Sequence, residues 1–175
     1  KLVDGFTFTM PDTPANQAAY PQPTSQKRGV GFPIARACAI LSLATACVMD
    51  AAIGPYAGKE TGETALLREL FGSFSAGDLA VADRYYCSFL MIALLCQRQV
   101  DVCARLHQCR AVDFRRGQRL GHDDHLITWT KPARPKWMDE ETYATIPETL
   151  TLREILYRVT APGRRVQELT PTAPA

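Results

Sequence analysis

Two aspartates in this sequence stand where a pair of carboxylates could bind a divalent cation. Asp4 lies in residues 1–9, where phenylalanines alternate with threonines as in a β-strand. Asp83 directly follows the apolar run 79–82, which is typical of a buried strand. Ligands of α/β sheets lie outside the carboxyl ends of strands, and Mg²⁺ takes one or two carboxylates together with water and phosphate oxygens. The alternative from the residues alone is a turn at Asp4 and an ion pair between Asp83 and Arg84.

Two further groups of residues could carry chemistry. His122 and His125, with two aspartates between them, have the spacing of a metal-binding pair, but no second pair matches them, so we interpret the group as an exposed hairpin tip. Cys87 could be a nucleophile, but no histidine is near it in sequence, so a buried thiol is predicted instead. The six cysteines form no Cys-x2-Cys pair, and most lie in apolar runs, which predicts reduced, buried thiols of a cytosolic protein.

The elements that must position these residues alternate between strands and helices, which predicts an α/β fold with a mixed sheet. Residues 10–31 are rich in proline and glycine and are expected to be a long loop without a regular element. The expected order before it and after it is strand 1–9, two strands within 32–53 joined near 44–46, a helix capped by Thr61 and ending near 74, strand 79–82, a helix capped by Ser88 and ending near 98, and strand 100–106.

The chain changes character after residue 107. Residues 110–129 alternate in short segments with turn glycines, as in strands and hairpins, and 138–143 predict one or two helical turns. Residues 150–159 and 164–169 alternate again around a Pro-Gly turn. Residues 170–175 hold only proline, threonine and alanine, and we expect them to be disordered.

Composition limits the class of protein. The 175 residues allow one domain, or one domain with an insertion, and 46% hydrophobic residues suit a packed core. No apolar stretch has the roughly 20 residues that a membrane-spanning helix needs, so no membrane partner is expected. The formal charge of +2 conceals a basic block at residues 98–136, with 9 basic and 4 acidic residues. Such a block is a footprint for a polyanion or a solvated sheet face, and charge alone does not separate the two.

Several short motifs together resemble the bacterial insertion-sequence transposases of insertion-sequence family four, over residues 2 to 169. They are Leu2-Val3-Asp4-Gly5, Met10-Pro11-Asp12-Thr13-Pro14-Ala15-Asn16-Gln17, Gly31-Phe32-Pro33, Asp50-Ala51-Ala52-Ile53-Gly54-Pro55-Tyr56 and Ala82-Asp83-Arg84-Tyr85-Tyr86-Cys87-Ser88. The resemblance implies a DDE catalytic domain of ribonuclease H-like fold, that is, a mixed sheet with helices plus a strand-rich insertion. It implies a partial ribonuclease H-like core at 1–106, the insertion at 107–169 and a tail at 170–175.

The same resemblance implies metal-dependent cleavage and transfer of DNA strands at transposon ends. Asp4 and Asp83 correspond to the first two catalytic acids and to ligands of Mg²⁺, for which Mn²⁺ can substitute. The implied partners are transposon-end and target DNA, a dimer in a full-length synaptic complex and no membrane, in the bacterial cytoplasm and at the nucleoid when acting. The residues implied to contact DNA are Arg84, Tyr85, Lys27, Arg28, Arg110, Arg115, Arg116 and Arg119.

One part of the family pattern is not found in this chain. The third catalytic acid belongs to a Tyr-x2-Arg-x3-Glu-x6-Lys pattern, and neither Glu148 nor Glu154 has the required neighbours. We therefore expect the third acid to lie past Ala175, and the chain alone to bind metal weakly and cleave no DNA. Two alternatives stay open: a non-catalytic transposase remnant that at most binds DNA or a partner transposase, and another two-metal nuclease of the same fold whose last acid comes from elsewhere in the chain.

Overall fold

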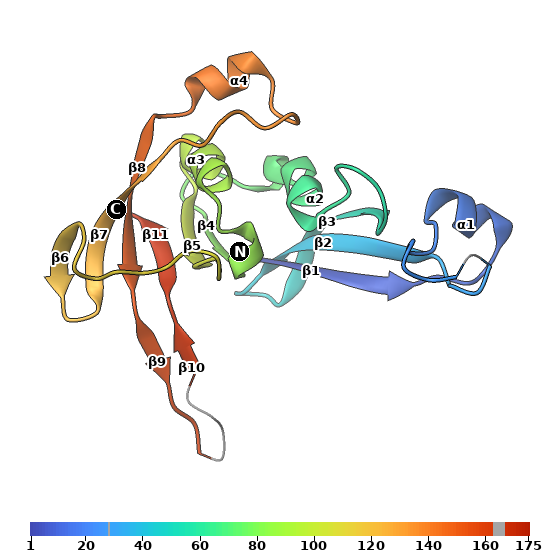
Figure 1. The fold of residues 1–175 in the computed structure, drawn as a ribbon, viewed down its shortest axis with the longest axis horizontal. Coiled ribbons are helices and arrows are strands. Elements are labelled where there is room, and N and C mark those ends of the chain that lie inside the picture. Colours follow the sequence, from blue (N-terminus) through green and yellow to red (C-terminus); the bar gives the residue numbers. More distant parts are fainter. Residues whose placement is uncertain (28, 163–166) are drawn as a thin grey trace. The chain divides into compact units, whose positions relative to one another are not determined.

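A computed structural model of the chain describes residues 1–27, 29–162 and 167–175, and it divides into two compact units, Lys1–Phe74 and Ser75–Ala175. Each unit combines a sheet with one or two short helices, so the fold is mixed α/β, with mostly antiparallel strands and few helices (Figure 1). No helix among the described residues is long and apolar enough to cross a membrane.

The first unit is built on three antiparallel strands, and the strands expected at residues 1–9 and within 32–53 are present. Strand β1 (Leu2–Thr9) pairs with β2 (Ile34–Ser42), and β2 pairs with β3 (Cys47–Pro55) after a tight turn. Helix α2 (Glu63–Glu69) packs on β2 and β3. It approaches closely because Gly54 of β3 has no side chain where Leu66 of the helix lies.

Two expectations for the first unit were wrong. The 10–31 segment contains a regular element after all, the short helix α1 (Pro14–Ala19), because Thr13 accepts a hydrogen bond from the backbone nitrogen of Asn16 at 3.2 Å and Pro14 suits the first helical position. Thr61 does not cap α2: the cap residue is Gly62, without a side-chain hydrogen bond, and the Thr61 hydroxyl donates to the Gly58 carbonyl instead. The helix ends at Glu69 and continues only as a 3-10 turn, η1 (Phe71–Ser73).

The second unit begins with a parallel strand pair and its crossover helix. Strand β4 (Leu79–Ala82) is parallel to β5 (Asp101–Arg105), and α3 (Phe89–Gln97) connects them after a 3-10 turn, η2 (Arg84–Tyr86). The predicted cap of α3 is confirmed, because the Ser88 hydroxyl oxygen accepts a hydrogen bond from the Met91 backbone nitrogen. The helix is apolar on every side and buries its first seven residues.

The rest of the second unit is a run of antiparallel strands, as expected for residues 110–169. Its sheet has the order β4-β5-β11-β8-β7-β6, and a separate two-stranded ribbon is formed by β9 and β10 (Figure 1). One further helix, α4, precedes β8. The bounds are β6 (Gln118–Gly121), β7 (Asp124–Thr130), α4 (Glu140–Thr145), β8 (Thr149–Ile155), β9 (Tyr157–Val159), β10 (Gln167–Leu169) and β11 (Pro171–Pro174).

The structure differs from the expectation of a disordered tail. Residues 171–174 form β11, which lies between β5 and β8 and is antiparallel to both. Its two prolines are its first and last residues, and the fully buried Thr172 between them lies opposite Ala104 on one side and Glu154 on the other. Low local strand propensity is therefore overridden by pairing on both edges.

Candidate functional site

Asp83 lies directly after β4, where the strand gives way to η2. It is the cap residue of that turn, and its carboxylate accepts a hydrogen bond from the Arg84 backbone nitrogen at 2.6 Å. Aspartate favours such a position because its short side chain reaches the free N–H groups of the first turn. The Arg84 guanidinium is 3.9 Å away, and the aspartate side chain is 57% exposed, so the remaining carboxylate oxygen is accessible to a ligand.

Asp4 lies inside β1 and is also exposed. It is opposite Ala39 of β2, and its carboxylate accepts a hydrogen bond from the Gly5 backbone nitrogen at 2.9 Å. Asp4 belongs to the first unit and Asp83 to the second. Both offer exposed hard oxygen donors of the kind that Mg²⁺ binds. Across residues 1–27, 29–162 and 167–175, no group of three or more His, Cys, Asp or Glu side chains is placed to hold a metal ion.

Two of the predicted DNA-contacting arginines meet at one pocket of the second unit. Arg84 and Arg110 line a cavity of about 200 Å³ together with a third arginine, Arg105 of β5. We call this cavity the basic pocket. The other residues that line it are Leu106, His107, Gln108, Val112, Glu168 and Thr170.

Contacts hold the side chains around the basic pocket. The Arg84 guanidinium donates to the Gln108 side-chain oxygen at 3.1 Å, and the Arg110 guanidinium lies 3.6 Å over the ring of Trp129. Glu168 is the one acidic residue that lines the pocket among the described residues, and its carboxylate is hydrogen bonded to Arg158 at 2.9 Å. The pocket lining therefore carries an excess of positive charge, and contacts hold two of its three arginines.

The other predicted DNA contacts are dispersed over exposed positions. Arg115 and Arg116 both pair with Asp113, at 2.8 and 3.6 Å, and the hydrogen bonds from Arg115 lower the pKa of Asp113 to about 2. Arg119 donates to the carbonyl oxygen of Gly121. Tyr85 is exposed with its ring edge-on to Tyr86, Lys27 is an exposed loop residue, and Arg28 lies outside the described residues.

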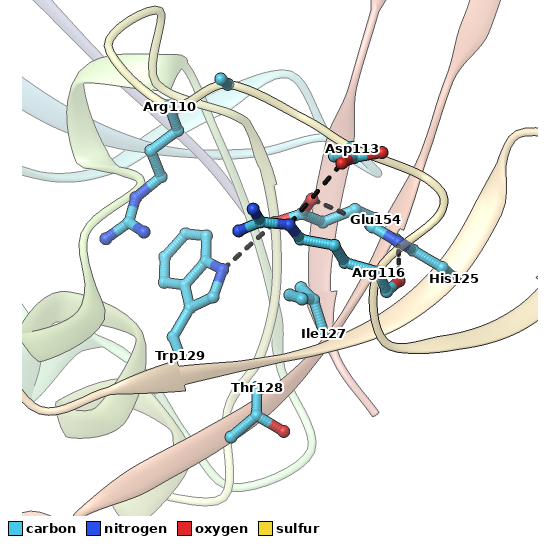
Figure 2. Close-up of a pocket in the computed structure, with 9 residues that line it drawn as sticks. Arg110, Asp113, Arg116, His125, Ile127, Thr128, Trp129 and Glu154 are labelled. Atoms are coloured by element: carbon cyan, nitrogen blue, oxygen red, sulfur yellow. Dashed lines mark hydrogen bonds and ion pairs between the residues drawn. The ribbon is translucent and has the colours of Figure 1, made fainter.

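Sequence reasoning missed a buried polar cluster formed by His125, Trp129 and Glu154. It lines a second pocket of the same unit, of about 450 Å³, with Arg110 and Asp113 on its rim (Figure 2). The Glu154 carboxylate accepts from the Trp129 indole nitrogen at 3.2 Å and lies 3.1 Å from His125 Nε2. His125 is 1% exposed and Glu154 is 5% exposed, so these polar side chains depend on hydrogen bonds within the cluster for stabilisation.

The hydrogen bonds of His125 show which ring nitrogen must carry a hydrogen. His125 Nδ1 is 2.8 Å from the backbone carbonyl oxygen of Arg116, and because a carbonyl only accepts, Nδ1 must carry a hydrogen. Nε2 then either donates to the Glu154 carboxylate or accepts from its protonated form, so the two side chains share one proton. The carboxylate also accepts from Trp129, so Glu154 connects the two aromatic side chains.

His125 corrects the expectation of an exposed hairpin tip at residues 122–125. The turn is present and His122 is exposed, but β7 begins at Asp124, and the alternation along the strand directs His125 inward with Trp129. The period-two pattern of 125, 127 and 129 was the signal that could have identified this inner face. Its partner Glu154 lies directly opposite it on the neighbouring strand β8, and no local sequence pattern indicates this pairing.

The cysteine expectation is confirmed only in part. Cys38 and Cys87 are buried, but Cys47 and Cys109 are exposed, and all six are free thiols. Burial raises the pKa of the Cys87 thiol to about 11, which opposes formation of a nucleophilic thiolate and agrees with the prediction of an inert thiol.

No model of a protein family and no curated protein sequence matches this chain. The site residues themselves therefore supply the argument for function: two exposed carboxylates that suit a hard cation, and arginines that suit a phosphate.

Proposed function

We propose that this chain is part of the catalytic domain of a DNA transposase of insertion-sequence family four, with a ribonuclease H-like core. The observation that carries the proposal is the order of elements around the two aspartates. Three antiparallel strands, the first with Asp4, are followed by a helix and by a parallel strand–helix–strand unit, and Asp83 ends the first strand of that unit. This order agrees with the one that the sequence resemblance implies.

In this proposal Asp4 and Asp83 hold Mg²⁺, with Mn²⁺ as a substitute. When bound, the metal ions stabilise the attacking and leaving oxygens of a displacement at phosphorus. The chain's own part is to present accessible carboxylate oxygens. Asp4 is held on a paired strand, and Asp83 is oriented by its hydrogen bond to the Arg84 backbone nitrogen.

The proposed substrate is DNA, at transposon ends and at a target site. The basic residues that the resemblance implicates bind backbone phosphates, which position DNA without reading its sequence. The remaining exposed basic residues of the second unit add long-range attraction for a polyanion. A dimer in a full-length synaptic complex, acting at the nucleoid in the bacterial cytoplasm, belongs to the same proposal.

Metal binding tests the proposal directly. Mn²⁺ titration, followed by calorimetry, is expected to give weak binding that Asp4→Asn and Asp83→Asn each weaken further, because each removes one ligand charge. Asp101→Asn, at an exposed position on β5, is the matched control and leaves the affinity unchanged. Unchanged affinity in both site variants would overturn the metal site and with it both the transposase and the general nuclease readings.

Strand cleavage tests how complete the site is. Because no glutamate here has the Tyr, Arg and Lys neighbours of the third acid, we expect the purified chain to leave a transposon-end duplex intact in Mg²⁺ or Mn²⁺. Nicking or joining by the chain alone contradicts that expectation and supports a site complete within these residues.

The missing pattern also favours a second candidate, a non-catalytic remnant that binds DNA or a partner transposase. Such a remnant keeps DNA affinity that falls steeply with salt, because binding releases counterions from the phosphates. Salt-dependent binding with no metal affinity at Asp4 and Asp83 supports the remnant, and a chain without saturable DNA binding excludes both candidates.

A further inference from the structure

Three arginines line the basic pocket, so its wall carries more basic than acidic side chains among the described residues. Arg84 follows β4, Arg105 ends β5 and Arg110 lies in the loop beyond it, so the three come from separate places in the chain. The positive charges on these side chains repel one another. The single acidic residue that lines the pocket among the described residues, Glu168, already pairs with Arg158. Asp83 lies 3.9 Å from the Arg84 guanidinium, so these two carboxylates offset only part of the charge on the three arginines.

Two of the three arginines are held in place before any ligand arrives. Arg84 is fixed by Gln108, and Arg110 is stacked on Trp129, whose indole nitrogen is in turn tied to Glu154. Arg105 extends from the end of β5, where it lies opposite Pro171 of β11. Preorganised side chains lose less conformational entropy on binding, so this arrangement favours an anion more than dispersed surface arginines do.

His107 adds a donor of defined geometry. Its Nδ1 accepts a hydrogen bond from the Cys109 backbone nitrogen at 3.2 Å, so in the neutral ring the hydrogen is on Nε2. Guanidinium forks and an imidazole N–H are donors only, and together they match the several acceptor oxygens of a phosphate group.

We infer that the basic pocket, through Arg84, Arg105, Arg110 and His107, binds one phosphate group. The favoured source is a phosphodiester of a DNA backbone, and that choice of source rests on the proposed function. Arg105 and His107 are new participants, since the sequence resemblance does not implicate them. Arg115, Arg116 and Arg119 are excluded from this pocket and contribute only diffuse attraction.

The test compares variants of equal charge in the full chain. Fluorescence anisotropy with a labelled DNA duplex, in metal-free buffer over a range of salt, is expected to show about tenfold weaker binding for Arg105→Gln and for Arg84→Gln. The slope of log affinity against log salt should fall by about one in each. Arg98→Gln is the matched control, because it removes the same charge from the same basic block at the end of α3, away from the pocket. Arg105→Lys should recover part of the lost affinity.

The controls separate the outcomes. Thermal melts identify any variant that does not fold, and Arg84, which is on the surface turn η2, keeps the test available if Arg105→Gln unfolds. Equal loss in Arg98→Gln and Arg105→Gln, or no loss in either pocket variant, overturns the pocket as a phosphate site.

A second probe, inorganic phosphate, distinguishes the source of the phosphate. Titration followed by amide resonances of residues 107 and 108 is expected to saturate only at high concentration and to compete with the duplex. Tight phosphate binding that Arg105→Gln abolishes, with DNA affinity unaffected, overturns the backbone assignment in favour of a free phosphate. The phosphate titration does not depend on metal. Phosphate binding without metal affinity at Asp4 and Asp83 would therefore support the phosphate site and exclude the proposed metal-dependent transposase activity.

Discussion

The imidazole of His125 and the carboxylate of Glu154 meet 3.1 Å apart in the interior of the second unit. They come from neighbouring strands, β7 and β8, and lie directly opposite each other in the register of that pair. The Trp129 indole completes the cluster and carries Arg110 on its outer face, so the buried pair supports a side chain of the basic pocket. The cluster therefore connects a buried polar pair to a residue that lines the basic pocket.

Removal of one partner from the buried pair should be costly. Glu154→Ala leaves the His125 and Trp129 donors without an acceptor, and we expect a loss of about 3–5 kcal/mol in the free energy of unfolding, measured by urea denaturation. Glu154→Gln keeps an acceptor oxygen and should cost less. Glu148→Ala is the control, because Glu148 is 85% exposed and its buried partner Lys131 keeps a hydrogen bond to the Ile146 carbonyl oxygen. Equal stability of the Glu154 and Glu148 alanine variants would show that the buried pair contributes nothing.

Gly117 should be irreplaceable for two separate reasons. Its φ of 73° is in the left-handed region, and an added Cβ would collide with the backbone carbonyl oxygen of Leu126. Gly77 has a similar φ of 85° but open space around it. We expect Gly77→Ala to cost about 1 kcal/mol from backbone strain and Gly117→Ala to cost about 2–4 kcal/mol, because backbone overlap adds to strain. Urea denaturation compares them, and equal losses would refute the collision.

The cysteines should separate by their rates of alkylation. Cys47 and Cys109 are exposed and should react with iodoacetamide at once, whereas Cys87 is buried and its pKa is raised from 9.0 to about 11. At pH 8 the thiolate fraction of Cys87 is then about a hundredfold below that of an ordinary thiol. Mass spectrometry of digested peptides gives the order, and early labelling of Cys87 in the folded chain would contradict it.

The raised pKa of Cys87 also determines how the free energy of unfolding changes with pH. Because the folded-state pKa of Cys87 is raised, the stabilising contribution is fully present below the ordinary pKa of 9.0 and is lost as pH rises through about 11. Unfolding midpoints in urea should therefore fall between pH 9 and 11, and Cys87→Ala should reduce that dependence.

Deletion of residues 170–175 should unfold the second unit. Strand β11 pairs with β5 on one side and β8 on the other, so its loss leaves two open strand edges and removes the fully buried Thr172. A double replacement, Pro171→Ala with Pro174→Ala, keeps the backbone strand and is the control. Loss of near-ultraviolet circular dichroism only in the deletion is expected, and an unchanged spectrum would support a dispensable tail.

Local patterns predicted most strands and the helix that follows Ser88. The alternation in residues 1–9 and the apolar run 79–82 each indicate one element, and the structure has β1 and β4 there. These segments are predictable because the pattern of apolar and polar residues along each of them indicates which side chains are buried. The cap at Thr61 was wrong because hydroxyl residues often bond to a nearby carbonyl instead, as Thr61 does with Gly58.

Features that depend on distant partners were not predictable. Strand β11 has a weak local signal and exists because two other strands supply its hydrogen bonds. The pairing of His125 with Glu154 depends on the β7–β8 register, and the convergence of Arg84 with Arg105 depends on the β4–β5 pair. For the same reason the sequence indicated basic residues in number but not the pocket in which three of them meet.

The position of β11 has a consequence for how the second unit folds during synthesis on the ribosome. Within the second unit this strand is the link between the β4–β5 pair and the β8–β7–β6 sheet, and it is formed by residues 171–174. Because synthesis runs from the N-terminus to the C-terminus, both halves of this sheet are made before the strand that joins them. Until β11 is made, each half has an unpaired strand edge. Contacts this distant in sequence form slowly. The nascent second unit is thus most vulnerable to aggregation and proteolysis until translation has passed these residues and β11 inserts.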